Sequence, residues 1–455
     1  MESKPMTQLN TSEGSSYMLE KVVYYALLVA IFLMPSVPAV FVELTIRPEE
    51  LLLPVVALIL LKNRDLNKNS YLLFLMLFAA YIFLTIVVNG RFFKVRDYFE
   101  IYKLAKYGIL FMYFFRYTKL VDFRHSVRLV LGGLLVFNLA QYFNIFYFNE
   151  YIEPLYAKAI HLRSFGVNSI GMPAVKRMLG TMGNPNNNAL MFLFFAIFFA
   201  PIPKQSRLDT VLFLLSFLAI LACQSRTGMI AFMVVMFVHF IVQAIRRMAK
   251  WRYVTKYAVG LVLVFFCFST VDNLWIERGI EQTENMTEAQ IIELQEQQAA
   301  ESGVDVNSND YIMSLVEQDM SQTTSVKGRL EVWKHLWGMV KKKPIFGHGP
   351  YKEYFYDNNL YSESEYMLVI WRYGFIGLLF YLVWIALPLI RSFKHYDYVS
   401  HKYLWLYSIV IMLAAITNNP FSEPRILAIY ALLIGHFFFL LSKTPEVDEK
   451  TLADR

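Results

Sequence analysis

The chain has 455 residues, of which 56% are hydrophobic and only 17% are charged, and its formal net charge is +7. Long apolar runs recur from Val22 to Leu441, which is typical of a polytopic membrane protein. Much of the basic excess lies in short connections between these runs, so the charge does not indicate a nucleic-acid partner.

The apolar runs predict an all-α fold. A bilayer core needs about 20 apolar residues per helix, which gives about twelve transmembrane helices. The second, sixth and eleventh are the weakest matches, and the first has no small-residue cleavage site of a signal peptide. The expected spans are 22–40, 46–61, 71–89, 100–116, 128–148, 187–202, 208–223, 227–245, 255–271, 364–390, 403–417 and 425–442.

The basic residues of the loops predict which side of the membrane each end of these spans faces. Those of the short loops gather on one side, apart from the 91–96 loop, and the positive-inside rule places that side in the cytoplasm. Both termini are then cytoplasmic. The expected organisation is helices one to nine with an outward loop near 149–186 in residues 1–271, a large outward loop at 272–363, helices ten to twelve at 364–442, and a cytoplasmic tail at 443–455.

The large outward loop has two parts. Residues 277–319 are rich in carboxylates, which fits a solvated helix or flap. From Ser325 the apolar residues recur at spacings of three and four, which predicts an amphipathic helix that Pro344 and Gly347 end. Its apolar face is expected on the membrane surface or on the helical bundle.

A smaller set of arginines falls on the outward side, and arginine binds phosphate oxygens bidentately while staying charged. Arg226 lies between two helices in a connection of only a few residues, where positive charge is disfavoured, so we expect it to have a function. Arg425, at the end of a span, fits a headgroup anchor. The set comprises Arg163, Arg177, Arg226, Arg329 and Arg425.

Other polar motifs share this side, and several have two interpretations. The asparagines at 184–188 could cap a helix or bind sugar hydroxyls. His348 fits a structural or a functional role equally, and Glu365 could simply complement a helix dipole. Asn418-Asn419-Pro420 is a further polar motif. Cys223 and Cys267 lie in predicted spans, and neither a metal site nor a cofactor is predicted.

These motifs resemble the O-antigen polymerase and O-antigen ligase superfamily of bacterial polysaccharide assembly. In order they are Gly183-Asn184-Pro185-Asn186, Gln224-Ser225-Arg226-Thr227-Gly228, Arg329 with Trp333, Pro344-Ile345-Phe346-Gly347-His348-Gly349-Pro350, and Glu363-Ser364 before Gly374-Phe375-Ile376-Gly377. Ligases of the superfamily carry a His, then Asn, Ser or Gln, then nine residues and GxxG. Here Glu363 stands where that His would, which favours a polymerase over a ligase.

The resemblance implies glycosyl transfer at the periplasmic face of the bacterial inner membrane. Donor and acceptor would be oligosaccharides on undecaprenyl diphosphate, with a chain-length regulator and a flippase as further partners. Arg226 and Arg329 would hold the diphosphate, with Arg163 and Arg177 as further candidates. Glu363 would be the base, and Asn186 and His348 would line the sugar cleft.

Two alternatives stay open. A ligase would use the same donor but transfer the glycan to lipid A–core. A flippase or other transporter predicts broken helices and ionisable residues near the bilayer midplane. Lys103 and Lys106 are the marked basic candidates for such residues, and they could instead face the outer cleft.

Overall fold

The computed structural model describes residues 17–35, 37–38, 45–62, 70–157, 177–202, 205–247, 251–271, 326–352, 354, 362–394 and 398–443. Its main helices are α2 (Met18–Phe32), α3 (Pro48–Lys62), α4 (Ser70–Val88), α5 (Phe99–Tyr117), α6 (Phe123–Tyr142), α10 (Pro185–Phe198), α11 (Arg207–Ala222), α12 (Arg226–Ile245), α13 (Trp251–Val271), α17 (Val326–Val340), α19 (Glu365–Lys394), α20 (Tyr398–Thr417) and α21 (Pro424–Lys443).

Short elements join these helices. They are η1 (Val95–Tyr98), η2 (Thr118–Leu120), η3 (Ile145–Tyr147), α7 (Phe148–Tyr151), α8 (Glu153–Tyr156), η4 (Pro420–Ser422) and the antiparallel pair β1 (Val37–Pro38) and β2 (Thr45–Ile46). The predicted helical fold is therefore confirmed over the described ranges. The predicted span 22–40 is too long, because α2 ends at Phe32 and residues 37–38 form β1.

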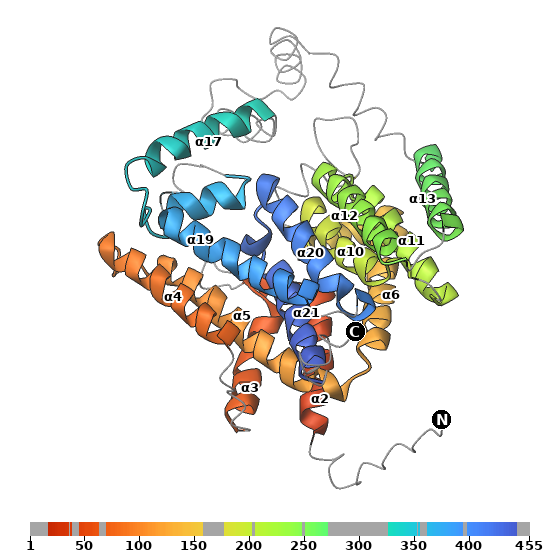
Figure 1. Ribbon diagram of the computed structural model, residues 1–455, viewed down its shortest axis with the longest axis horizontal. Helices are drawn as coiled ribbons and strands as arrows, with labels where there is room; N and C mark the ends of the chain where they lie inside the picture. Colours follow the sequence, from red (N-terminus) through yellow and green to blue (C-terminus); the bar gives the residue numbers. More distant parts are fainter. Residues whose placement is uncertain are drawn as a thin grey trace, which may run out of the picture.

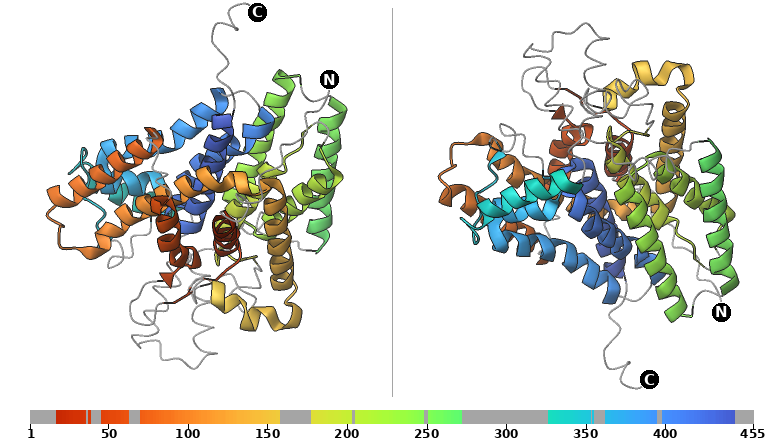
Figure 2. Two further views of the ribbon diagram at one scale, coloured as in Figure 1. Left: turned by 90° about the horizontal axis from the view of Figure 1, so that it is seen from below. Right: turned by 90° about the horizontal axis from the view of Figure 1, so that it is seen from above.

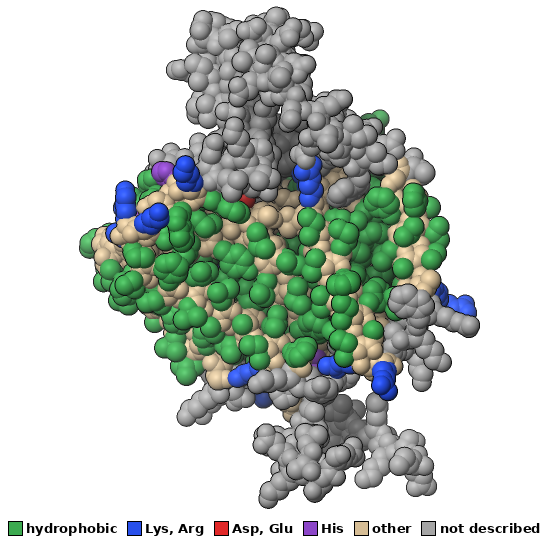
Figure 3. All heavy atoms as spheres, turned by 45° about the horizontal axis from the view of Figure 1, so that its top comes forward, with side chains coloured by type: hydrophobic (Ala, Val, Ile, Leu, Met, Phe, Trp, Pro, Cys, Tyr) green, Lys and Arg blue, Asp and Glu red, His purple; other side chains and the backbone are tan. Residues whose placement is uncertain are grey.

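The structure supports a membrane protein, although twelve spans stay a prediction. Among the described residues, five helices are long and apolar enough to cross a bilayer: α4, α6, α12, α19 and α21. Hydrophobic side chains cover the middle of the face in Figure 3, and Lys and Arg lie at its upper and lower margins. This belt between polar ends is the surface expected of a protein embedded in lipid.

Helix α21 lies at the centre of the bundle, where it packs along α5 and contacts α2, α10 and α20 (Figure 1). Of its apolar window, 72% is buried inside the protein, compared with 39% for the other four long apolar helices. Helix α10 is also enclosed, because every side chain from Asn188 to Ile197 is buried. Seen from above and below, the remaining helices surround this core (Figure 2). The two enclosed helices can therefore hold polar groups away from lipid.

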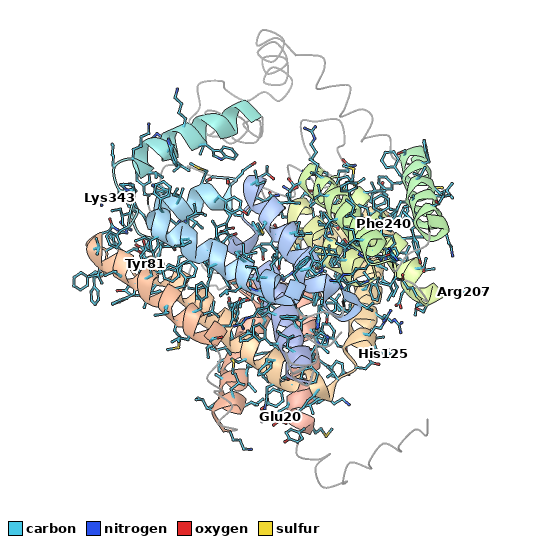
Figure 4. All side chains as sticks on the ribbon, in the orientation of Figure 1. Glu20, Tyr81, His125, Arg207, Phe240 and Lys343 are labelled. Carbon is cyan, nitrogen blue, oxygen red and sulfur yellow. The ribbon has the colours of Figure 1, made fainter. Side chains whose placement is uncertain are left out.

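Helix ends that the sequence places on the same side of the membrane contact one another. On the predicted cytoplasmic side, Arg391 Nη2 donates to Ser70 Oγ at 3.1 Å, and Arg128 Nε pairs with Asp209 at 2.9 Å. On the other side, Asn89 Nδ2 donates to the Gly347 carbonyl at 3.2 Å. Figure 4 shows Lys343 and Tyr81 at the upper left, with Glu20, His125 and Arg207 lower or to the right. Which side faces the cytoplasm stays a prediction.

The predicted span 364–390 is not one continuous helix. Gly374 interrupts α19 with φ +65° and ψ −167°. The rings of Tyr366 and Tyr381 are 5.9 Å apart, whereas the 15 intervening steps of a straight helix would rise about 22 Å. Helix α19 therefore folds back on itself, with one arm at 365–373 and the other at 375–394.

The segment after α17 fills the break in α19 with backbone hydrogen bonds. Phe375 N donates to the Pro344 carbonyl at 2.9 Å, and Gly349 N donates to the Arg372 carbonyl at 2.8 Å. Tyr81 adds a side-chain donor, because its hydroxyl lies 2.6 Å from the Tyr373 carbonyl. Backbone groups exposed by a broken helix need such partners at membrane depth.

Helix α17 packs on the first arm of α19. Leu336 and Val340 are buried against Leu368, Ile370 and Trp371. Trp337, from the same predicted apolar face, is 41% exposed. The amphipathic helix is thus confirmed, and the bundle rather than the membrane surface receives most of its apolar face.

Candidate functional site

Three residues at the end of α20, Thr417, Asn418 and Asn419, connect the motifs that the sequence singles out. We call them the outer hub. Helix α20 ends at Thr417 because Pro420 has no backbone N–H and begins η4. The hub contacts the first turn of α10, the start of α12 and the segment before α19.

The α10 side supplies Arg177 and Asn186. Asn184 caps this helix by accepting hydrogen bonds from the backbone of Asn186 and Asn187, so the predicted cap is confirmed. Arg177 Nη2 donates to Asn186 Oδ1 at 3.1 Å, and Asn186 Nδ2 reaches Asn418 Oδ1 at 3.5 Å. Arg177 Nε also donates to the Cys223 carbonyl at 3.2 Å, which ties it to the turn before α12.

The α12 side supplies Arg226 as the first residue of its helix. Ser225 caps the helix through the Gly228 N–H at 3.2 Å. A Cβ on Gly228 would lie 2.7 Å from Ala189 Cβ, so only glycine allows α12 this close to α10. The Thr227 hydroxyl lies 2.8 Å from that of Thr417 in the hub, and the Arg226 side chain is exposed.

The α19 side supplies Glu363, which is half-buried just before the helix. The two serines beside it are held in place. Asn419 Nδ2 donates to the Ser362 carbonyl at 2.6 Å, and Ser364 Oγ donates to the Ala415 carbonyl at 3.2 Å. The next helix residue is also tied to the hub, because Glu365 N donates to the Asn418 carbonyl at 3.2 Å.

The outer hub therefore contacts the three segments that carry the Glu363 carboxylate and the guanidinium groups of Arg177 and Arg226. A carboxylate can accept a proton from a hydroxyl. Arginines can hold an anion, and amides can bond sugar hydroxyls. The sequence marks Asn418 and Asn419 only as polar, and the contacts that make them central come from distant segments.

Of the remaining predicted site residues, only His348 has a described side chain. The backbone of Arg329 belongs to α17, but its side chain lies outside the described residues, as does all of Arg163. His348 lies at the break in α19, where its Nε2–H donates to the Met339 carbonyl at 3.0 Å. Burial lowers the pKa of His348. Its local role is to hold the 344–349 segment, and its sugar contact stays a prediction.

The prediction that Arg425 is a headgroup anchor is wrong. Its side chain is only 2% exposed, and its guanidinium donates to the backbone carbonyls of Thr181 and Met34. Arg47 and Glu423 pair beside it at 2.6 Å. Burial acts to raise the pKa of Glu423, but the positive charges of Arg47 and Arg425 lower it overall.

The two marked lysines of α5 are paired with carboxylates. Lys106 is 2% exposed and lies 3.0 Å from Glu49 and 2.9 Å from Glu50. Lys103 lies 2.7 Å from Glu100. Lysine pairing of this kind explains how both cations are accommodated within a predicted span. Cys223 is buried and Cys267 exposed, and in the described part of the chain no group of three His, Cys, Asp or Glu residues could hold a metal.

A protein-family model described as O-antigen ligase matches residues 211–382. The resemblance to the O-antigen ligase and polymerase superfamily is confirmed. The matched segment of this superfamily includes Arg226, Arg329, His348 and Glu363, and it includes the break at Gly374. It ends before the outer hub and begins after Arg177 and Asn186. The search of curated proteins found no match.

Proposed function

We propose that the protein polymerises undecaprenyl-diphosphate-linked oligosaccharide repeat units into a surface polysaccharide at the periplasmic face of the inner membrane. The family match supports ligase- or polymerase-type activity in general. The observation that carries the finer proposal is the outer hub, which ties the segment carrying Glu363 to those carrying Arg177 and Arg226.

In this proposal the hydroxyl oxygen of the acceptor sugar attacks the anomeric carbon of the donor. Glu363 takes the hydroxyl proton as that bond forms. The bond from the anomeric carbon to the diphosphate oxygen breaks, and undecaprenyl diphosphate leaves with the electron pair. Arg177 and Arg226 stabilise the negative charge that develops on it. Arg329 and Arg163 are further proposed diphosphate ligands, and Asn186 and His348 are proposed sugar contacts.

The test is extension of a lipid-diphosphate repeat unit by the purified protein in detergent. Glu363→Gln and Arg226→Ala are each expected to lower the rate by about 100-fold or more, which is typical for a general base or a preorganised charge. Arg207→Ala is the matched control. Arg207 is also exposed, also begins its helix and also follows a capping serine, but lies at the start of α11 on the predicted cytoplasmic side. Unchanged extension in both site variants would refute the assignment.

A ligase is the second candidate, since the matching model is described by that activity. Glu363 at the position of the ligase His favours the polymerase. The glycans of a deletion strain separate the two. Loss of a polymerase leaves single repeats on the lipid A–core, whereas loss of a ligase leaves long chains on the lipid carrier.

The same extension reaction, run with and without a chelator, tests whether arginines suffice for the diphosphate. We expect the rate to be unaffected by the chelator, because guanidinium groups neutralise the leaving group in this mechanism. A requirement for added divalent metal would remove the arginine-only mechanism.

A further inference from the structure

Helix α17 ends in an exposed basic and aromatic surface beside the break in α19. Three consecutive lysines follow the helix, Lys341, Lys342 and Lys343, and the side chain of each is exposed. Trp337 lies one turn before them and is 41% exposed. Its ring is 6.4 Å from that of Phe375, which is 51% exposed on the second arm of α19. We call these five residues the α17 rim.

The α17 rim lies at the edge of the apolar belt. With 15 residues, α17 is too short to cross a bilayer, and it packs instead on the first arm of α19. Lys343 Nζ donates to Asn89 Oδ1 at 2.6 Å, and Asn89 directly follows α4, which is long and apolar enough to span. Figure 4 shows Lys343 at the upper left, and Figure 3 shows Lys and Arg at the upper margin of the hydrophobic face. Amphipathic helices with lysines and aromatic residues at this depth lie in the headgroup region of a bilayer.

No carboxylate of the described ranges pairs with the three lysines of the α17 rim. The hydrogen bond of Lys343 goes to a neutral amide. The acidic groups of the adjoining turn before α5 already have cations of their own. Asp97 is buried and pairs with Arg91 at 2.5 Å, and Glu100 is surrounded by three cations. The positive charge of the rim is therefore exposed and not offset by these groups, so it can attract an anion from outside the chain.

The mixture of side chains in the α17 rim restricts what that anion can be. Trp337 and Lys341 are four residues apart and so lie on one face of the helix. A phospholipid with net negative charge offers both complements, because its phosphate attracts the ammonium groups and its acyl chains cover the aromatic rings. A soluble anion would leave the rings in water, and a zwitterionic headgroup has no net charge to attract lysines. The continuity of the rim with the apolar belt favours the lipid over an acidic protein.

We propose that the α17 rim binds the headgroup of an anionic phospholipid through Lys341 and Lys342, with Trp337 and Phe375 against its acyl chains. The bound lipid then lies beside the turned helix, because the segment after the lysines supplies the Pro344 carbonyl that accepts from Phe375 N at 2.9 Å. This inference does not rest on the proposed function, since it requires only that α17 lies at the membrane surface.

The test is quenching of Trp337 fluorescence by brominated lipid, with the full-length protein in phosphatidylcholine nanodiscs. The difference between the wild type and Trp337→Phe isolates the signal of this tryptophan. Brominated phosphatidylglycerol should reach half-maximal quenching at a mole fraction about 10-fold lower than equally brominated phosphatidylcholine, because each lysine attracts an anionic headgroup. Lys341→Gln/Lys342→Gln should make the two curves coincide. Lys343 is kept in this variant because it bonds Asn89.

Arg246→Gln/Arg247→Gln is the matched control and should keep the preference for phosphatidylglycerol. This basic pair also follows an apolar helix, α12, but on the predicted cytoplasmic side. The lysine variant should keep the wild-type Tm, since both side chains are exposed and neither forms an ion pair within the described ranges.

Salt gives a second measurement on the unchanged protein. At about 1 M salt the preference for phosphatidylglycerol should disappear, because exposed charges are then screened beyond about 3 Å. Coincident curves in the wild type at low salt would overturn the inference, as would a preference that survives the loss of both lysines. If neither lipid quenched Trp337, the rim would lie outside the membrane, and an acidic protein would replace the lipid as its partner.

Discussion

Gly347 and Gly374 meet backbone to backbone at the turn of α19. A Cβ on Gly347 would lie 2.6 Å from Gly374 N, and both glycines have φ +65°. Residues with side chains rarely adopt this conformation, and here there is also no space for one. The two glycines thus allow the segment after α17 to hydrogen-bond the broken helix, and the first arm of the folded α19 begins at the outer hub, where Glu365 N donates to the Asn418 carbonyl.

Gly374→Ala is expected to destabilise the protein by about 3 kcal/mol or more, because it combines a strained φ with a backbone clash. A Cβ at this position would lie 2.6 Å from the Pro344 carbonyl oxygen and closer still to that of Ile345. Thermal unfolding in detergent measures the effect. Gly338→Ala in α17 is the control, since a Cβ there meets nothing within 4 Å and alanine favours a helix by about 1 kcal/mol. Equal Tm values for the two variants would contradict the packing described.

Arg425→Ala is expected to cost about 3 kcal/mol of unfolding free energy, because it leaves two buried carbonyl groups without their donor and removes one of the two cations that stabilise Glu423. Arg226→Ala removes an exposed side chain and should stay within about 0.5 kcal/mol of wild type. Denaturation of both variants in the same detergent tests the contrast. If Arg425→Ala left the unfolding free energy unchanged, the headgroup-anchor interpretation would be restored.

Stability should fall in acid through Glu423. Because its folded-state pKa is lowered by Arg47 and Arg425, ionised Glu423 stabilises the fold above its unfolded pKa of about 4.3. That contribution is lost as the pH falls through the lower folded-state value. Glu423→Gln should therefore show a shallower loss of Tm than wild type below about pH 4.3. Glu150→Gln, at an exposed carboxylate, is the control and should follow the wild-type curve.

Asn418→Ala is expected to slow chain extension by about 10-fold with little change in Tm, because it loosens Asn186 and Arg177 without removing a helix cap. Asn184→Ala should instead lower Tm and leave the extension rate nearly unchanged. It removes the α10 cap and should cost about 1 kcal/mol of stability. Rate and Tm measured on both variants separate positioning from folding. A fall in Tm for Asn418→Ala as large as for Asn184→Ala would make the hub merely structural.

The sequence predicts the helices well because apolar composition and capping residues act locally. Asn184 and Ser225 cap the helices that they precede, and Pro344 follows the amphipathic helix α17. The break in α19 escaped prediction, although Gly374 is visible in the motif. A glycine within an apolar run is compatible with a straight helix, and only the approach of Ile345 and Gly347 shows that this one is turned.

The same distinction applies to the charged residues. The sequence by itself determined the helical class and the resemblance to the superfamily, since these depend on composition, spacing and motif. Tertiary structure alone decided that Arg425 is buried, that Asn418 and Asn419 join three distant segments, and that α19 turns back at Gly374. Those facts follow from contacts between residues far apart in the chain, and the burial of each group is fixed only when the helices pack.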